Sequence, residues 1–138
     1  MGPSLVAGSY AAWNYFESLN SPVNRKFVAA YRAKFGDAAA LDDPMAHGYI
    51  DVLTWAAAVK KANSFDPDAV RRAAVQLEWD DSVMGKIRFA ANQSLYQTAY
   101  VGQLQPDGQF KILWQSKEPL APEPYDPLAF PGKSCAVK

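Results

Sequence analysis

The sequence lacks most features that mark an enzyme or a metalloprotein. Its 138 residues include one cysteine and one histidine, so a Cys/His zinc cluster and an internal disulfide are both excluded. No serine has a plausible histidine relay, and the Gly-x-Ser-x-Gly turn of α/β-hydrolases is absent. We therefore predict no catalytic residues, no metal ligands and no cofactor, and we do not expect an enzyme.

The sequence also lacks an excess of positive or negative charge. Lys plus Arg and Asp plus Glu both number 14, and no basic patch indicates a nucleic-acid partner. No apolar run approaches the roughly 18 residues of a membrane-spanning helix. What the chain does contain is 49% hydrophobic and 13% aromatic residues, which argues against disorder and suits one domain with a real core.

Three helix start signals recur at prolines. Ser21-Pro22 predicts a helix that ends at Gly36, Asp42-Asp43-Pro44 predicts one that stops near Asn63, and Asp66-Pro67 predicts a third. We expect the three helices to pack as neighbours. Each helix has apolar residues at helical spacing. They are Phe27, Val28, Tyr31 and Phe35 in the first helix, Met45, Tyr49, Val52, Leu53, Ala56 and Val59 in the second, and Val70, Ala73, Ala74 and Leu77 in the third.

Strands are predicted at both ends of this helical part. Residues 8–16 suit a strand leading into a loop, and alternation predicts strands in 85–89, parts of 96–104 and 110–114. Pro106-Asp107-Gly108 predicts a hairpin turn between the last two strands. The fold class is therefore α/β, in the order strand, three helices and three strands.

The chain after Lys117 is rich in proline, which favours an extended arm lying on a surface. A free linker is the alternative, and large apolar side chains favour packing onto the body. These prolines and apolar residues are Pro119, Leu120, Pro122, Pro124, Tyr125, Pro127, Leu128, Phe130 and Pro131.

Several stretches together resemble the C-terminal portion of a type I periplasmic solute-binding protein. The aromatic-rich segment and capped helix of residues 8–36 resemble its opening, and residues 62–71 are similar to an "AGSxDxxAVR" pattern. Residues 84–89 and 107–116 resemble a returning strand and a closing hairpin, and residues 119–125 resemble a "PxxPxPY" tail. The resemblance is to the urea- and short-chain-amide-binding branch of the branched-chain amino acid receptor family.

The resemblance implies a fragment of a two-lobed α/β fold whose lobes are joined by crossovers. Residues 1–20 would be a crossover strand and loop, and 21–80 the helical part of one lobe. Residues 81–116 would be the returning strands and hairpin of the other lobe, and 117–138 the Pro-rich C-terminal arm. Met1 falls where the family is mid-chain and no secretion signal follows it, so we expect a processed or engineered fragment.

The implied function is solute capture for an ABC importer, with urea or a short-chain amide as ligand. The parent protein would be periplasmic, and its partners would be a small polar solute and ABC permease subunits, not nucleic acid. Two alternatives stay open: a cytosolic amide-sensing regulatory protein, and a self-contained interaction domain without a small ligand. Uncovered strand edges also predict a possible strand-exchanged homodimer of the fragment.

The resemblance places candidate ligand-binding residues beside the cleft. Tyr10 and Trp13 lie near the expected crossover, where aromatic faces contact a small polar ligand in the family; burial for packing is the alternative, as for Tyr15. Residues 43–45, which are Asp43, Pro44 and Met45, begin a helix whose N-terminus would face the cleft, with Asp43 as its cap.

Two further polar features have ordinary explanations. His47 lies one turn into the second helix and is expected to be a satisfied surface or partly buried group. Asp80 and Asp81 are adjacent in sequence, so on a strand or loop their carboxylates point apart and do not form an acid–base pair.

Overall fold

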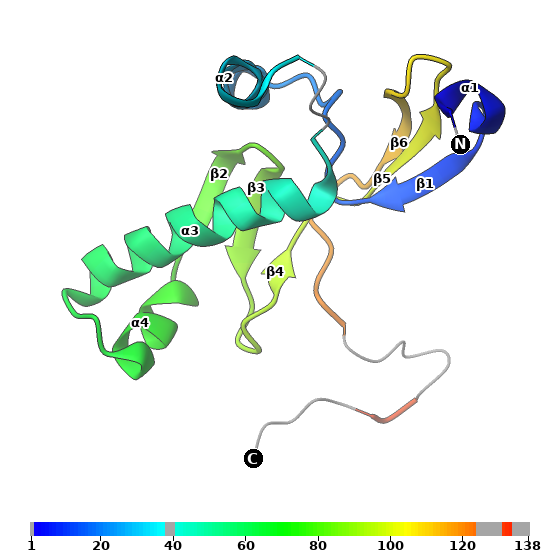
Figure 1. The fold of residues 1–138 in the computed structure, drawn as a ribbon. Helices are drawn as coiled ribbons and strands as arrows, with labels where there is room; N and C mark the ends of the chain where they lie inside the picture. The colour runs from blue at the N-terminus through cyan, green and yellow to red at the C-terminus, as the bar shows by residue number, and fades with distance from the viewer. Residues whose placement is uncertain (1, 38–40, 124–130, 134–138) are drawn as a thin grey trace.

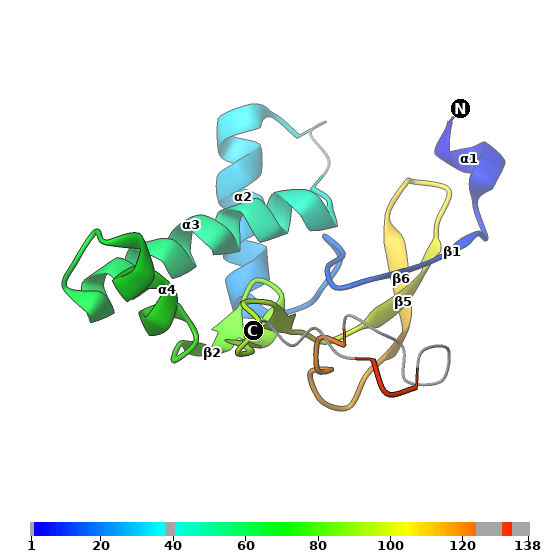
Figure 2. The same ribbon diagram turned by 90° about the horizontal axis from the view of Figure 1, so that it is seen from below.

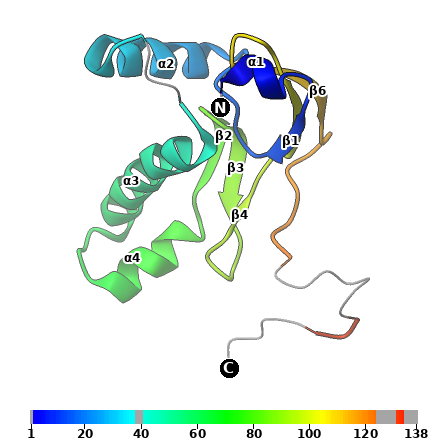
Figure 3. The same ribbon diagram turned by 45° about the vertical axis from the view of Figure 1, so that its right-hand side comes forward.

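The chain folds into two halves, each built around its own three-stranded sheet (Figure 1). The computed structural model describes residues 2–37, 41–123 and 131–133. One sheet has the order β1-β5-β6, and the other has the order β2-β3-β4 and carries the three long helices beside it (Figures 1 and 3). The expected α/β class is confirmed. Of the Pro-rich arm, residues 124–130 and 134–138, Cys135 among them, lie outside the described residues.

The three predicted helices are present, and α2 and α4 begin at the predicted prolines. Helix α2 is Pro22–Phe35, α3 is Asp43–Ala62 and α4 is Pro67–Ala74. Gly36 ends α2 with a φ of 92°, and Asn63 ends α3 in the left-handed conformation. A short helix that the sequence did not suggest, α1, occupies Pro3–Val6.

The cap of α3 lies one residue earlier than expected. Asp42, not Asp43, is the N-cap, and its Oδ1 accepts the Met45 N–H at 3.0 Å. Asp43 is the first helical residue, and Pro44 follows it at a position where no N–H has to be satisfied within the helix. The expectation that Asp43 caps the helix is therefore wrong, because the helix starts one residue earlier.

The apolar stripe expected along α3 is not its buried face. The helix instead buries Ala46, Ile50, Thr54 and Ala58, a row spaced by four residues. Small side chains in this row allow close packing of α3 on the residues beneath it. The larger apolar residues stay exposed in the described part of the chain, and they are Met45, Tyr49, Val52, Leu53 and Trp55.

The β1-β5-β6 sheet is antiparallel throughout. Strand β5 (Tyr100–Leu104) lies in the middle and pairs with β1 (Tyr10–Trp13) and β6 (Phe110–Gln115). The predicted hairpin turn is confirmed: Gly108 has a φ of 86° and donates its N–H to the Gln105 carbonyl at 3.0 Å.

The β2-β3-β4 sheet forms the other half together with the helices. Strand β3 (Gly85–Phe89) pairs with β2 (Glu78–Ser82) and β4 (Leu95–Tyr96), not with β5. The sequence suggested that residues 85–89 return to the other lobe, but Ile87 is fully buried in the core of the helical half. We therefore propose that the two halves meet at residues 97–99 rather than near residue 81.

The main core joins the helices to the β2–β3 hairpin. It contains Tyr15, Leu41, Ala46, Ile50, Val83, Met84 and Ile87. A smaller cluster of Ala58, Val70 and Ala73 fixes α4 against α3. Within the described residues, no helix has the length and apolar character needed to cross a membrane.

Candidate functional site

The first turn of α3 lies at the junction between the two halves (Figures 1 and 2). Three segments come together there: residues 14–21 after β1, residues 97–99 between β4 and β5, and residues 116–120 after β6. Hydrogen bonds tie these segments to one another and to α3. This junction is the candidate functional site.

Asn14 connects the first segment to both of its neighbours. Its backbone N–H donates to Asp43 Oδ1 at 3.1 Å, and its side-chain amide donates to the Thr98 carbonyl at 3.0 Å. The Asp43 side chain is only 16% exposed, so this contact is largely withdrawn from water. Residue 14 thus joins the end of β1 to α3 and to the β4–β5 connection.

His47 extends the connection from α3. Its Nδ1 lies 2.9 Å from the Asp43 carbonyl oxygen and 3.1 Å from Asp43 Oδ2, and both of these atoms are acceptors. Its Nε2 lies 2.7 Å from Gln97 Nε2, which is an amide donor. These partners select the tautomer with the proton on Nδ1, and the bare Nε2 accepts from Gln97. The side chain is partly buried and fully partnered, as expected for an ordinary histidine.

The third segment is tied to the second by backbone hydrogen bonds. Gln97 and Leu120 form an isolated antiparallel bridge, in which the Leu120 N–H donates to the Gln97 carbonyl at 2.8 Å. Buried Ser116 pairs with Ala99 in both directions, and its hydroxyl donates to the Glu118 carbonyl at 2.8 Å. All three segments at the junction are therefore held together.

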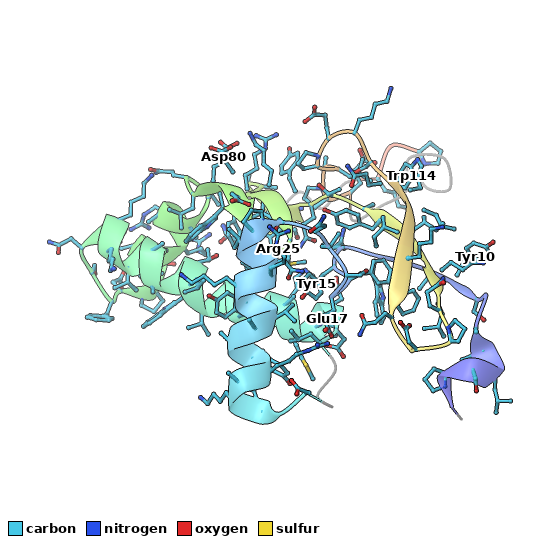
Figure 4. All side chains as sticks on the ribbon, turned by 90° about the horizontal axis from the view of Figure 1, so that it is seen from above. Tyr10, Tyr15, Glu17, Arg25, Asp80 and Trp114 are labelled. Atoms are coloured by element: carbon cyan, nitrogen blue, oxygen red, sulfur yellow. The ribbon has the colours of Figure 1, made fainter. Side chains whose placement is uncertain are left out.

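The aromatic candidates lie in three different environments. Trp13 is adjacent to Asn14, is 45% exposed and has its ring centroid 6.0 Å from that of Phe16. Tyr10 is three residues away on β1, or roughly 10 Å at the usual strand rise, and it points away from the molecule (Figure 4). Tyr15 is completely buried, as the packing alternative predicted. Trp13 is therefore the aromatic candidate beside the junction.

The residues at the start of α3 also differ in their surroundings. Both carboxylate oxygens of Asp43 already have partners within the chain. Pro44 is exposed, and Met45 Sδ accepts from the Tyr31 hydroxyl at 3.6 Å. Met45 lines an apolar groove of about 780 Å³ between α2 and α3, rather than the face that carries Asp43.

Glu17 and Tyr15 form a buried polar group next to the junction (Figure 4). One Glu17 oxygen pairs with the Arg32 guanidinium, and the other accepts the Leu41 N–H at 3.1 Å. Burial and, next, the negative charge of Glu17 raise the pKa of Tyr15, and its hydrogen bond to Asn24 opposes that rise. Tyr15 is therefore a neutral hydrogen-bond donor at physiological pH.

Asp80 of β2 pairs with a lysine of β3. The Lys86 ammonium lies 3.2 Å from Asp80 Oδ1 and 2.9 Å from Glu78 Oε1, and these hydrogen bonds raise the pKa of Lys86. Asp80 lies at the surface, with its side chain 86% exposed (Figure 4). In the part of the chain that the structure describes, no three His, Cys, Asp or Glu side chains are grouped as a metal site.

Sequence reasoning missed most of the junction network. The Asp43–His47 spacing of four residues on a helix is a signal that could have suggested their contact. Nothing local indicated Asn14, Gln97 or Thr98, because their partners are 29 to 84 residues away in the chain.

Comparison with known families decides what kind of protein carries this junction. The sequence profile described as "Periplasmic binding protein domain" matches residues 1–129. The chain belongs to the periplasmic binding protein family. This family supplies solute-binding proteins of ABC transporters rather than enzymes, and membership confirms the broad resemblance read from the sequence.

Solved structures of binding proteins share the fold. A solute-binding protein from Rhodopseudomonas palustris in complex with 3,4-dihydroxybenzoic acid matches 84% of this chain with a TM-score of 0.75 and 23% identity. A branched-chain amino acid ABC transporter ligand-binding protein from Burkholderia xenovorans matches 86% with a TM-score of 0.74 and 20% identity. A leucine-binding protein from Thermotoga maritima matches 80% with a TM-score of 0.67 and 22% identity.

The chain spans only part of these relatives. It covers 32% of the R. palustris and B. xenovorans proteins and 31% of the T. maritima protein. A curated protein named limonene hydroxylase, from Geobacillus stearothermophilus, is 30% identical over 124 residues, which are 90% of this chain and 23% of that protein.

Proposed function

We propose that this chain is the C-terminal part of the substrate-binding component of an ABC importer, and that the complete protein captures urea or a short-chain amide in the periplasm. The observation that carries the proposal is the junction. Two sheet-based halves meet where three chain segments and the first turn of α3 come together. Such an arrangement suits a protein that binds a solute between two lobes.

The proposed mechanism is hinge closure. A solute that contacts both lobes binds the closed form better than the open form, so it shifts the population toward closure. The closed form would then present the surface that permease subunits recognise. The junction segments are the only connections between the two halves in the described residues, so rotation between the halves must be absorbed there.

The proposed ligand contacts remain those suggested by the family resemblance. Trp13 is supported by its exposed ring beside the junction, and Pro44 by its exposure at the start of α3. Met45 lines the groove between α2 and α3, so it would contact a solute only from that side of the helix. Tyr10 would contact solute only if another part of the complete protein brought the ligand to the outer end of β1. Asp43 would act mainly by holding the turn in place, because its carboxylate is already hydrogen-bonded.

Titration calorimetry tests the ligand class. The panel contains urea, acetamide and formamide, and also 3,4-dihydroxybenzoate and leucine, which represent the solved relatives. For the complete protein, we expect binding of an amide and none of the aromatic acid. Preference for the aromatic acid or for leucine would overturn the amide proposal and leave solute capture in place.

The same titration on the 138-residue chain tests the fragment proposal. This chain covers about a third of its relatives, and affinity depends on contacts from both lobes at once. We expect weak binding or none. A micromolar dissociation constant for any amide would show that the chain is a complete binding unit.

Two alternatives from the sequence have their own tests. A cytosolic amide sensor would be found in the cytosolic fraction of cells with a partner protein, whereas a transport component would be found in the periplasmic fraction. A self-contained interaction domain would be monomeric, cooperatively folded and indifferent to every solute in the panel.

A further inference from the structure

The junction contains a continuous hydrogen-bond path that links α3 to two of the three segments. The path runs from Thr98 through Asn14, Asp43 and His47 to Gln97, which is adjacent to Thr98. It therefore forms a closed ring through side chains and backbone. Each link measured between heavy atoms is 2.7 to 3.1 Å long.

We propose that this ring, formed by Asn14, Asp43, His47, Gln97 and Thr98, is a positioning device that sets the orientation of the helical half relative to the β1-β5-β6 sheet. None of these residues needs to touch a solute. Asp43 and His47 fix the first turn of α3, and Asn14 and Gln97 attach that turn to the segments that rotate when the halves move.

The hydrogen-bond donors and acceptors of the ring are matched in one order, so the ring favours one arrangement of the junction. Asp43 offers two oxygens and its carbonyl as acceptors, so it takes one N–H from Asn14 and the Nδ1–H of His47. The imidazole then has only an acceptor left for Gln97. Each donor meets an acceptor only in this arrangement, so a rotated junction would leave partly buried groups without partners.

Partial burial strengthens these contacts. The side chains of Asp43 and His47 are 16% and 28% exposed, so solvent competes with the ring less than at the surface. The charged groups that face His47 are limited to Asp43 among the contacts recorded for the described residues. The Asp43 carboxylate thus sets the orientation of the imidazole, and the Gln97 amide donates a hydrogen bond to it in that orientation.

The proposal refines the closing motion suggested above and rests on it for its biological meaning. Its test uses no solute, so its failure would leave the ligand proposal standing, and the reverse also holds. The 138-residue chain itself is the material. Its single histidine gives one imidazole signal in a nitrogen-15 spectrum, and its single cysteine is removed by Cys135→Ser before spin labels are attached.

The first measurement is the tautomer of His47 at neutral pH or above. Nitrogen-15 shifts distinguish a protonated ring nitrogen from a bare one. We expect the proton on Nδ1 and a bare, hydrogen-bonded Nε2. A proton on Nε2 instead would break the Asp43–His47 link and overturn the ring.

The second measurement is the distance between the halves. Spin labels are placed at exposed Asp51 on α3 and exposed Lys111 on β6, and labelled chain is mixed with excess unlabelled chain so that only intramolecular pairs contribute. In Gln97→Leu, we expect a broader or shifted distance distribution with the His47 tautomer unchanged. Asn14→Ala removes a different link and should broaden the distribution in the same way.

The matched control is Gln103→Leu. Gln103 is a partly exposed glutamine on β5 whose amide contacts Gly8 and Tyr10 within one half of the molecule. We expect the control to keep the wild-type distribution. Distributions unchanged from wild type in both width and position in folded Gln97→Leu and Asn14→Ala would overturn the proposal, as would an equal change in the control.

Discussion

The buried hydroxyl of Tyr15 donates a hydrogen bond to Asn24 Oδ1 at 2.9 Å. The amide nitrogen of Asn24 in turn donates to the Glu17 and Leu19 carbonyls at 2.9 and 2.8 Å. Asn24 is 1% exposed, and every polar atom of its side chain has a partner. This contact joins the chain leaving β1 to the first turn of α2, and from it we expect the stability of the fold to depend on alkaline pH.

The first prediction concerns that pH dependence. Because the pKa of Tyr15 is raised on folding, the unfolded chain releases the proton near pH ~10 while the folded chain keeps it. The contribution of the Tyr15 hydroxyl to the free energy of unfolding is therefore fully present below pH ~10. Above that pH it falls by at most about 1.4 kcal/mol per pH unit. The free energy of unfolding can be measured by urea denaturation between about pH 8 and 11. It should fall less steeply with rising pH in Tyr15→Phe than in the wild type.

Tyr100→Phe serves as the comparison for Tyr15→Phe. Burial also raises the pKa of Tyr100, and its hydrogen bond to Thr98 opposes the rise. Each substitution should remove only its own part of the alkaline decline. If Tyr15→Phe declined as steeply as wild type, the Tyr15 hydroxyl would not be held neutral by the fold.

The second prediction separates Asp42 from Asp43. Asp42→Ala removes the N-cap of α3 and should lower the free energy of unfolding by about 0.5–2 kcal/mol. Asp43→Ala removes no cap, but it leaves the Asn14 N–H and His47 Nδ1 without their carboxylate partner. Only Asp43→Ala should therefore change the His47 nitrogen-15 shifts, while both variants lower the melting temperature.

In the complete protein, the same pair of variants tests the site at the α3 start. Asp42→Ala should leave solute affinity unchanged once folded protein is counted. Asp43→Ala should weaken it well below the melting temperature. Unchanged affinity in Asp43→Ala would remove Asp43 from the proposed binding site.

The third prediction contrasts two glycines. A Cβ at Gly102 would lie 3.1 Å from the rings of both Phe16 and Phe110, so Gly102→Ala forces a packed aromatic pair apart. We expect a loss of about 1–3 kcal/mol in thermal or urea unfolding. Gly48 lies within α3 with open space around it, and Gly48→Ala should raise stability by about 0.5–1 kcal/mol. A neutral Gly102→Ala would show that the two rings move apart freely.

The fourth prediction is that the chain self-associates. Val52 and Trp55 are 65% and 55% exposed on α3, and exposed apolar patches of this kind promote association. Light scattering should show a mass above the monomer, and the double variant Val52→Lys, Trp55→Lys should reduce it. Leu113→Lys on β6 tests the strand-exchange alternative in the same way. A sharp wild-type monomer would contradict both routes.

Local sequence determined helices α2, α3 and α4 and the turn between β5 and β6. Ser21 and Asp66 before prolines, Gly36 and Asn63 at helix ends, and Pro106-Asp107-Gly108 between strands act through backbone geometry within a few residues. Their effects do not depend on the rest of the fold, so the sequence was sufficient to predict them. The alternation of apolar and polar residues, which is also a local pattern, indicated β5 and β6.

Tertiary structure decided which surfaces are buried and which residues meet. The buried face of α3 is a row that includes the small residues Ala46 and Ala58 rather than the larger apolar stripe. Ala46 packs in the core that contains the β2–β3 hairpin, and Ala58 packs against α4. Strand β3 joined the helical half because its partner is β2, a choice that alternation alone does not specify. Asn14 reaches Asp43, and Gln97 reaches His47, only in the tertiary fold, since hydrogen bonds between residues so distant in sequence leave no local pattern.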